Sequence, residues 1–141
     1  MYKYNTIVKI HHTDAVGIAF YATYYTLAQE CLETFLDSKG SSLQEILNKT
    51  VTPVVHSEAD YFSPIRLSDK ITIELTLDKI GTSSFALKYT FSNKNEEVVA
   101  QVKTIYVSLD KKTSKKIPIP QFLKDLFTMP RNVEPQLGKL S

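Results

Sequence analysis

The stretch ATYYTLAQECLETFLDS, residues 22–38, decides the fold of this chain. Its apolar side chains recur at steps of three and four residues, at Tyr24, Leu27, Ala28, Cys31, Leu32, Phe35 and Leu36. This spacing places them on one stripe of an α-helix, with the polar residues mostly on the other faces. Thr23 is a candidate cap, although the helix could begin one turn earlier, and Gly40 is the stop signal. The sequence therefore predicts one long amphipathic helix over residues 22–38.

The segments on both sides of this helix have the patterns of β-strands. In residues 71–78, apolar and polar side chains alternate strictly, and in residues 85–92 the large apolar side chains alternate with Ala86, Lys88, Thr90 and Ser92, as in strands with one buried and one solvated face. Further strands are predicted over residues 4–11, 52–61 and 98–109. The last of these is more uniformly apolar, which predicts a central position in the sheet.

Two short helices and the order of the elements complete the predicted architecture. Ser42 and Glu45 have the spacing of a capping box at the start of a helix over residues 42–48, and a last helix is predicted over residues 121–127. One long helix before a run of mostly antiparallel strands indicates an α+β domain. The helix stripe needs an apolar surface, so we expect an antiparallel β-sheet wrapped around one long central helix. Residues 1–130 form this single domain in our interpretation, and residues 131–141 a loose C-terminal tail.

Composition and charge exclude several classes of protein. The chain has 141 residues, and its formal net charge of +2 is too small to indicate nucleic-acid binding. No apolar run approaches the roughly 20 residues that span a bilayer, and the N-terminus lacks a signal-peptide core, so we expect no stable membrane association. The single cysteine, Cys31, cannot form an intramolecular disulfide and is expected to be buried, which favours a cytoplasmic location. A sheet with one lone helix leaves edges open, so we expect edge strands to pair in a dimer.

The residues just before the long helix carry the strongest chemical signal, in the string HTDAVGIAFY, residues 12–21. A helix start presents free backbone N–H groups, which can stabilise the oxyanion that forms during acyl transfer. Asp14 could attack a carbonyl carbon or deprotonate a water that does, and Gly17 would let the backbone approach the substrate closely. A thioester suits a site with no His-Ser or His-Cys pair, because its thiol leaves readily as a thiolate. Alternatively, Asp14 is an ordinary turn or helix-cap residue.

The neighbouring histidines and tyrosines have plainer interpretations. His11 and His12 are interpreted as polar residues at a strand end, where adjacent side chains point to opposite faces. We therefore expect no metal site at this pair. Tyr21, Tyr24 and Tyr25 are interpreted first as packing residues.

Two segments of the chain resemble a known family. The string DAVGIAFYATY, residues 14–24, and the string DYFSPIRLSDKI, residues 60–71, are similar to the 4-hydroxybenzoyl-CoA thioesterase family, whose fold is called the hot dog. The similarity covers roughly residues 4–127. It implies dimers or dimers of dimers, and hydrolysis of acyl-CoA thioesters without metal or cofactor. It also implies that Asp14 is the catalytic carboxylate, that the backbone N–H of Tyr21 polarises the thioester carbonyl, and that Gly17 lies in the connecting turn.

Within that family, the strings PVVH at residues 53–56 and KKIPIP at residues 115–120 resemble the hydrolases of 1,4-dihydroxy-2-naphthoyl-CoA. His56 could hydrogen-bond a phenolic acyl group, or it could be a strand histidine satisfied inside a dimer. Tyr24 is a further candidate for substrate binding.

The residues that bind the CoA phosphates depart from the family pattern. Some relatives carry basic residues in the turn that here contains the hydroxyls of Thr82 and Ser83. Phosphate binding could use these hydroxyls, or it could shift to lysines, namely Lys79, Lys111, Lys112, Lys115 and Lys116. The alternative for the lysines is a solvated basic loop.

Two competing functions stay open at the level of the sequence. A hot-dog dehydratase acting on β-hydroxyacyl thioesters needs a histidine paired with an acid on the helix, and here Asp14 precedes the helix. A non-catalytic module that binds acyl-CoA could use the same fold and turn.

Overall fold

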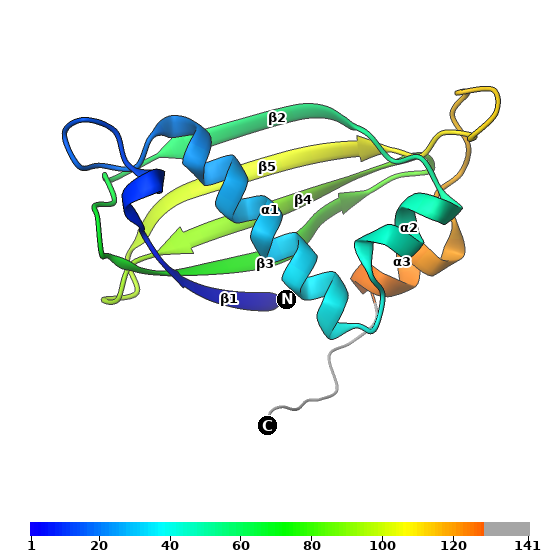
Figure 1. The fold of residues 1–141 in the computed structure, drawn as a ribbon. Coiled ribbons are helices and arrows are strands. Elements are labelled where there is room, and N and C mark those ends of the chain that lie inside the picture. Colours follow the sequence, from blue (N-terminus) through cyan, green and yellow to red (C-terminus); the bar gives the residue numbers. More distant parts are fainter. Residues whose placement is uncertain (129–141) are drawn as a thin grey trace.

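A five-stranded antiparallel sheet curves around one long helix in the computed structural model, which describes residues 1–128 (Figure 1). The strands are β1 (Tyr2–Ile7), β2 (Val54–Tyr61), β3 (Lys70–Ile80), β4 (Ser84–Ser92) and β5 (Val98–Val107). They lie in the order β1-β3-β4-β5-β2. The helices are the 3-10 turn η1 (Ile10–His12), α1 (Tyr21–Ser38), α2 (Leu43–Lys49) and α3 (Gln121–Thr128). The predicted α+β architecture, with the sheet wrapped around the long helix, is confirmed.

Helix α1 packs its apolar stripe on the concave face of the sheet. All seven residues of the predicted stripe are buried, and Leu27 and Cys31 have no exposed surface. The inward side chains of the strands, such as Ile73 and Leu87, are likewise inaccessible to solvent. Burial raises the pKa of the Cys31 thiol to about 12, so it is a packing group rather than a reactive thiol, as predicted. Complete burial of one such leucine or isoleucine stabilises the fold by about 1.5–3 kcal/mol.

The two edges of the sheet are β1 and β2, and they differ in exposure. Most of β2 is exposed, and its apolar residues Val54, Val55 and Tyr61 are each about half exposed to solvent. Phe62 N–H donates to Val99 O on the neighbouring strand at 2.9 Å. Because successive strand amides point to opposite sides, the amides of Ser57, Ala59 and Tyr61 face the open edge. The long strand β5 lies inside the sheet between β4 and β2, although β4 occupies the middle position.

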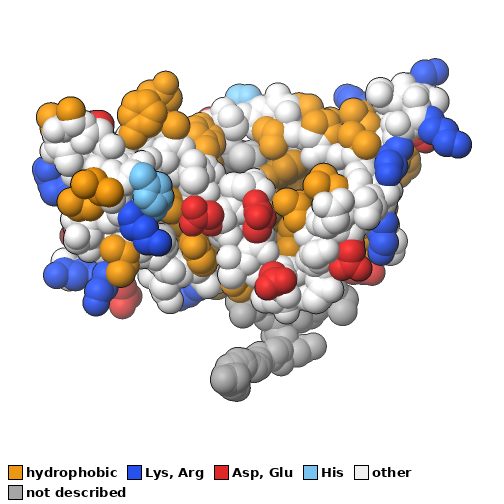
Figure 2. Space-filling model, viewed as in Figure 1, with side chains coloured by type: hydrophobic (Ala, Val, Ile, Leu, Met, Phe, Trp, Pro, Cys, Tyr) orange, Lys and Arg blue, Asp and Glu red, His pale blue; other side chains and the backbone are white. Residues whose placement is uncertain are grey.

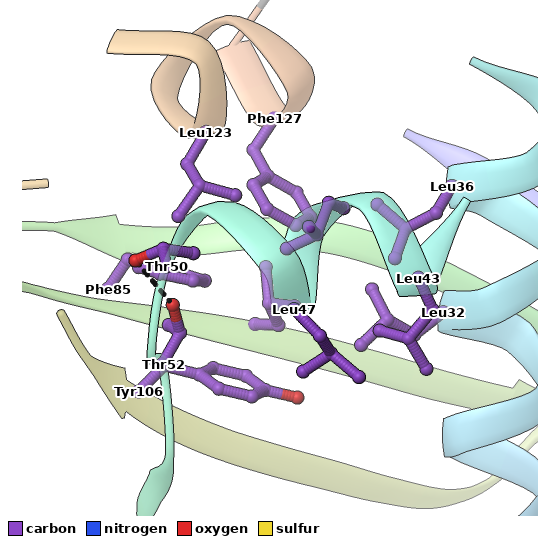
Figure 3. A pocket seen from close by; sticks show the side chains of 12 residues that line it. Leu32, Leu36, Leu43, Leu47, Thr50, Thr52, Phe85, Tyr106, Leu123 and Phe127 are labelled. Atoms are coloured by element: carbon purple, nitrogen blue, oxygen red, sulfur yellow. Dashed lines mark hydrogen bonds between the residues drawn. The ribbon is translucent and has the colours of Figure 1, made fainter. Parts of the chain in front are cut away.

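Helices α2 and α3 cover the end of the sheet away from the start of α1 (Figure 1). The predicted capping box of α2 is confirmed, because Ser42 Oγ accepts Glu45 N–H at 3.1 Å and Glu45 Oε1 accepts Ser42 N–H at 3.2 Å. An apolar cavity of about 80 Å³, open on one side, lies between these two helices, the second half of α1 and the sheet. Figure 3 shows leucines and aromatic rings around it, with the Thr50 and Thr52 hydroxyls 3.4 Å apart on one wall. No helix in residues 1–128 is long and apolar enough to cross a bilayer.

Two local predictions near the N-terminus were wrong. The first strand ends at Ile7 instead of residue 11, because His12 N–H donates to Lys9 O and Thr13 N–H donates to Ile10 O, which closes the turn η1. The candidate cap Thr23 is also wrong, because the cap is Phe20, and α1 begins earlier, at Tyr21, as the alternative interpretation allowed. Residues 129–130 of the predicted domain and the predicted tail, residues 131–141, lie outside the described residues.

Candidate active site

The loop that carries Asp14 is closed like a small hairpin directly before α1. Asp14 N–H donates to Ile18 O at 2.9 Å, and Thr13 pairs with Ala19 as an antiparallel bridge. Phe20 N–H donates to His12 O at 2.9 Å. Since α1 begins at the next residue, these contacts fix the Asp14 loop beside the start of the helix.

A second set of backbone contacts ties this loop to the segment after β2. Ala19 N–H donates to Ile65 O at 2.8 Å, and Leu67 N–H donates to Gly17 O at 3.2 Å. Gly17 has a φ of +80°, a backbone conformation that side-chain-bearing residues rarely adopt. A Cβ built at Gly17 would meet no atom within 4 Å, so the backbone borders open space there. The prediction that Gly17 lies in the connecting turn agrees with this geometry.

The Asp14 carboxylate is exposed and partly engaged. Its Oδ1 accepts Val16 N–H at 2.9 Å and Ile18 N–H at 3.4 Å, so Asp14 does serve as a turn residue. It is not the helix cap, because that position is taken by Phe20. No group in residues 1–128 donates to Oδ2 of Asp14. One oxygen of the carboxylate is therefore oriented by the loop, and the other is open to a ligand.

The start of α1 lacks a side-chain cap. Phe20 makes no capping hydrogen bond, and Tyr21, the first helical residue, is 65% exposed. Backbone N–H groups at an uncapped helix start are free donors in a region of partial positive charge. Hydrophobic side chains gather on the surface around this helix start (Figure 2), and they include Val16 and Phe20. The helix start can therefore donate a hydrogen bond to a carbonyl oxygen that lies beside an apolar surface.

An aromatic hollow of about 320 Å³ opens at the same place. It is lined by residues of the Asp14 loop, the first turn of α1 and the end of β2, namely Ile18, Ala19, Tyr21, Tyr24, Tyr61, Phe62, Ser63 and Pro64. The Tyr24 and Tyr61 rings lie 4.8 Å apart between centroids. Burial, together with the neighbouring Tyr61 phenol, raises the pKa of Tyr24, so this ring is a neutral wall of the hollow.

Tyr61 and Phe62 are site residues that the sequence interpretation did not assign. Both are about half exposed, and both line the hollow. Burial raises the pKa of Tyr61, and the nearby phenols of Tyr25 and Tyr21 raise it further. The available signal was an aromatic pair just before a proline at a strand end. The pattern belongs to the string DYFSPIRLSDKI, residues 60–71, which supports the resemblance to the family but does not by itself predict a pocket wall.

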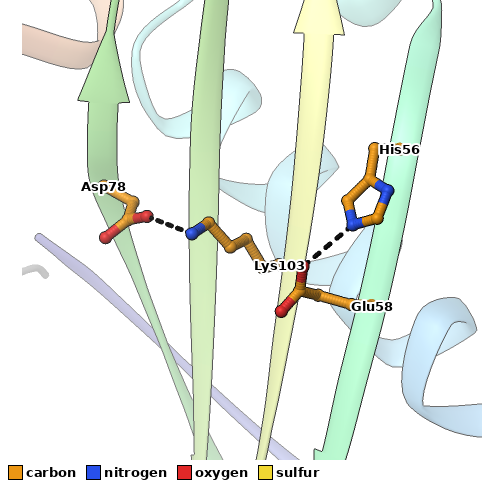
Figure 4. A network of polar contacts seen from close by, with 4 residues as sticks. All are labelled: His56, Glu58, Asp78 and Lys103. Atoms are coloured by element: carbon orange, nitrogen blue, oxygen red, sulfur yellow. Dashed lines mark hydrogen bonds and ion pairs between the residues drawn. The ribbon is translucent and has the colours of Figure 1, made fainter.

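His56 lies on the other face of the sheet. Its Nε2 is 2.8 Å from Glu58 Oε1, and both side chains are about half exposed. Figure 4 shows this pair on the convex face, with the helices behind the strands, beside Lys103, whose Nζ lies 3.0 Å from Asp78 Oδ2. The structure therefore does not bring His56 together with Asp14 in one chain.

The predicted phosphate ligands lie at the end of the sheet away from Asp14. Ser108 N–H donates to Ser83 O and Ile119 N–H donates to Thr82 O, each at 2.9 Å. Lys111 Nζ donates to Asn48 O at 2.6 Å. The neighbouring lysines, Lys112, Lys115 and Lys116, are exposed on the same loop. Within one chain, the structure separates this basic loop from the Asp14 loop by the length of β2.

The histidine pair has a different geometry from the one predicted. His11 and His12 belong to η1, and their ring centroids lie 4.1 Å apart, so the prediction that they point to opposite faces of a strand was wrong. Within residues 1–128 no three His, Cys, Asp or Glu side chains come together as metal ligands. The acids of α1 also lie outside the hollow, since Glu30 accepts a hydrogen bond from Tyr4 Oη at 3.1 Å and Glu33 accepts one from Gln29 at 3.0 Å.

The fold and the site define a class of protein that comparisons with known sequences identify. Residues 8–127 match the family model of the thioesterase-like superfamily, and the chain belongs to that superfamily. The predicted hot-dog fold and the predicted class of thioester hydrolase are confirmed.

Two of the similar sequences are hydrolases of the same acyl-CoA. A 1,4-dihydroxy-2-naphthoyl-CoA hydrolase of Synechococcus elongatus is 28% identical over 127 residues, which cover 88% of this chain and 93% of the relative. One from Prochlorococcus marinus strain NATL2A is 36% identical over 118 residues, which cover 77% of this chain and 76% of the relative.

Solved structures of acyl-CoA thioesterases have the same fold as this chain. The crystal structure of a 1,4-dihydroxy-2-naphthoyl-CoA thioesterase from Synechocystis superposes with a TM-score of 0.83 at 26% identity, covering 89% of this chain and 94% of that one. A gentisyl-coenzyme A thioesterase superposes with a TM-score of 0.77 at 27% identity, covering 89% of this chain and 98% of that one.

Proposed function

We propose that this protein hydrolyses an acyl-CoA thioester with an aromatic acyl group, of the kind represented by 1,4-dihydroxy-2-naphthoyl-CoA, to the free acid and CoA. One observation carries the proposal. An oriented, exposed carboxylate, Asp14, sits in a loop fixed beside an uncapped helix start, and two residues of the same loop, Ile18 and Ala19, line an aromatic hollow. The names of the relatives support the choice of acyl group.

The residues supply the chemistry without a metal or cofactor. In the proposed reaction the Tyr21 N–H donates to the thioester carbonyl oxygen and stabilises the oxyanion as it forms. The free oxygen of Asp14 attacks the carbonyl carbon or removes a proton from a water that attacks it. The C–S bond then breaks, and CoA leaves as a thiolate, for which a pKa of about 8.5 on the cysteine scale makes a strong general acid unnecessary. When water is the nucleophile, this step releases the free acid, and the proton held by Asp14 passes to the thiolate or to solvent. When Asp14 is the nucleophile, the acyl group stays on Asp14 as an anhydride, which a water hydrolyses to the free acid and the regenerated carboxylate.

The walls of the hollow favour an aromatic acyl group over a short aliphatic one. Tyr24 and Tyr61 pack against each other with their ring centroids 4.8 Å apart, and Phe62 adds a third ring, so the hollow has an aromatic wall against which an acyl ring can stack. Aromatic pairs of this kind contribute about 0.5–1.5 kcal/mol each beyond the area that they bury. We expect thiol release to be faster with aryl-CoAs than with acetyl-CoA in a panel assay. Calorimetric binding of aryl-CoAs with no thiol release would instead favour a non-catalytic binding module.

The working unit in this proposal is a homodimer, which could pair further into a dimer of dimers. The open edge of β2 offers the unpaired amides of Ser57, Ala59 and Tyr61 together with exposed apolar side chains. An exposed, apolar edge strand is a template for pairing with another strand. Two copies related by a twofold axis would pair β2 with β2 in antiparallel fashion, which extends the sheet across both chains.

That pairing would also unite the two halves of the predicted substrate site. An antiparallel pair of β2 strands sets the Val54 end of one copy beside the Tyr61 end of the other. The basic loop of one chain, residues 110–116, would then approach the Asp14 loop of its partner. The CoA phosphates would bind Lys111 and Lys112 from the second chain, while the thioester binds at the first.

The lone buried Cys31 also agrees with a reducing, cytoplasmic location.

The basic loop gives a testable consequence for substrate binding. We expect the double variant Lys111→Ala and Lys112→Ala to raise KM for acyl-CoA about 30-fold, since two charge-assisted phosphate contacts are lost, each with a contribution on the order of 1 kcal/mol. The kcat should change less than about threefold, because uniform binding is removed and transition-state contacts are kept. Lys3→Ala with Lys70→Ala, on the paired strands β1 and β3, is the charge-matched control. An unchanged KM in steady-state assays of the test pair would place the phosphates elsewhere.

A further inference from the structure

His12 lies at the neck of the Asp14 loop, and the proposed reaction does not use it. Its backbone oxygen accepts two hydrogen bonds, from Phe20 N–H at 2.9 Å and from Thr23 Oγ1 at 2.7 Å. Both donors lie at the start of α1. The His12 carbonyl therefore joins the entry of the loop to the start of the helix, only two residues before Asp14.

The imidazole ring of His12 holds the same residue in place through a separate hydrogen bond, to the backbone of η1. The side chain is 4% exposed, and Nδ1 accepts Lys9 N–H at 2.9 Å, which closes the turn η1 around the ring. Because Lys9 N–H is a donor, Nδ1 has to be the unprotonated nitrogen, and Nε2 carries the hydrogen in the neutral ring. Nε2 is buried, and no described residue accepts from it. A buried donor left in this state costs about 1–3 kcal/mol, so the ring is not a simple stabilising contact.

We propose that His12 is a positioning residue: its neutral ring and its carbonyl together hold the Asp14 loop in register with the Tyr21 N–H. The inference deepens the proposed thioesterase function and rests on it. Catalysis depends steeply on such register, because a displacement of about 1 Å between reacting groups can cost about 10²-fold in rate. His12 itself touches neither the thioester nor the water in this scheme.

The surroundings of the ring keep it neutral. Burial lowers the pKa of His12 below its ordinary value of 6.5, and the nearby His11 and Lys9 lower it further. The negative charge of Glu30 on α1, whose carboxylate accepts a hydrogen bond from the Tyr4 hydroxyl of β1, acts in the opposite direction and raises the pKa of His12. Protonation would turn Nδ1 into a donor facing Lys9 N–H and break the contact. Activity should therefore be complete above the ordinary pKa and fall as the pH drops through the lowered value.

Two variants separate the ring nitrogen from the volume of the side chain. His12→Leu fills the space but has no acceptor, so we expect kcat to fall about 10–100-fold while KM for acyl-CoA changes little. His12→Asn places an amide oxygen near the position of Nδ1, where it can accept Lys9 N–H. We therefore expect kcat within about threefold of wild type, because most of this hydrogen bond is kept. The Asn variant should also lose the low-pH decline of kcat that belongs to the imidazole.

Hydrogen exchange provides a readout that does not depend on turnover. The Lys9 and Phe20 amides should exchange at least about tenfold faster in His12→Leu than in wild type, and at nearly the wild-type rate in His12→Asn, since about 1.4 kcal/mol of local opening is a factor of ten. Wild-type kcat and wild-type exchange in His12→Leu would overturn the inference. So would a His12→Asn variant that is as slow as His12→Leu. If wild type releases no thiol from any acyl-CoA, the proposed function fails, and the exchange rates still decide whether His12 holds the loop.

Discussion

Asp14→Asn should lower kcat for acyl-CoA hydrolysis by about 10³-fold, within the 10²–10⁴-fold range of a lost catalytic acid or base. The amide has the same shape as the carboxylate and still offers an oxygen to Val16 N–H and Ile18 N–H. The loop should therefore keep its conformation, and KM should change little. What disappears is the negative charge on the free oxygen, which is required either for attack on the carbonyl or for activation of water. Free-thiol release from an aryl-CoA measures this loss.

Asp69→Asn is the matched control for this substitution. Asp69 is also a loop carboxylate that accepts a backbone amide, Arg66 N–H at 2.8 Å, and it does not line the aromatic hollow. Its amide variant should keep nearly the wild-type kcat. If Asp14→Asn releases thiol as fast as Asp69→Asn, then Asp14 is a turn residue alone, and the catalytic assignment fails.

Ser57→Pro should convert the dimer into monomers and remove most of the activity. The Ser57 amide faces the open edge of β2, so proline removes a donor needed for pairing and adds bulk at the interface, while the contacts with β5 remain. The mass measured by light scattering should drop from twice the chain mass to the 16.0 kDa of one chain. The rate at low substrate concentration should fall about 10²-fold, because the partner no longer brings its basic loop to the Asp14 loop, and loosely held substrate is misplaced.

Ser57→Ala separates pairing from the loss of the hydroxyl. It keeps the backbone donor, so it should remain dimeric and active. Circular dichroism should show that both variants retain the wild-type content of strand and helix. A monomeric Ser57→Pro variant with full activity would refute the shared site, and a Ser57→Pro variant that stays dimeric would move the interface to another surface.

Periodicity was sufficient to predict most of the fold. The seven apolar positions of α1 and the alternation of large apolar side chains in β3 and β4 are direct consequences of helix and strand geometry. The predicted first strand extended too far, to residue 11, whereas hydrogen bonds within η1 turn the backbone after Ile7. Thr23 was assigned as a cap because its residue type is typical of caps, but its hydroxyl bonds the distant His12 carbonyl instead.

The site was harder to predict than the fold, because it depends on contacts between distant segments. Asp14 and Tyr21 are close in sequence, and their relation follows from a short loop before a helix. Tyr61 reaches the same hollow from β2, which a single sequence does not reveal. The face on which His56 lies depends on a register shift between Val54 and His56, which no alternation pattern predicts.

The central claim is that a thioester carbonyl binds at the start of α1 beside Asp14. The most direct measurement is a crystal structure of Asp14→Asn with an intact aryl-CoA. We predict that the thioester oxygen lies about 2.7–3.1 Å from the Tyr21 nitrogen, as expected for an oxyanion donor, with the acyl ring against Tyr24 and Tyr61. An acyl group bound in the cavity under α2 and α3, with the start of α1 facing only solvent, would contradict the account.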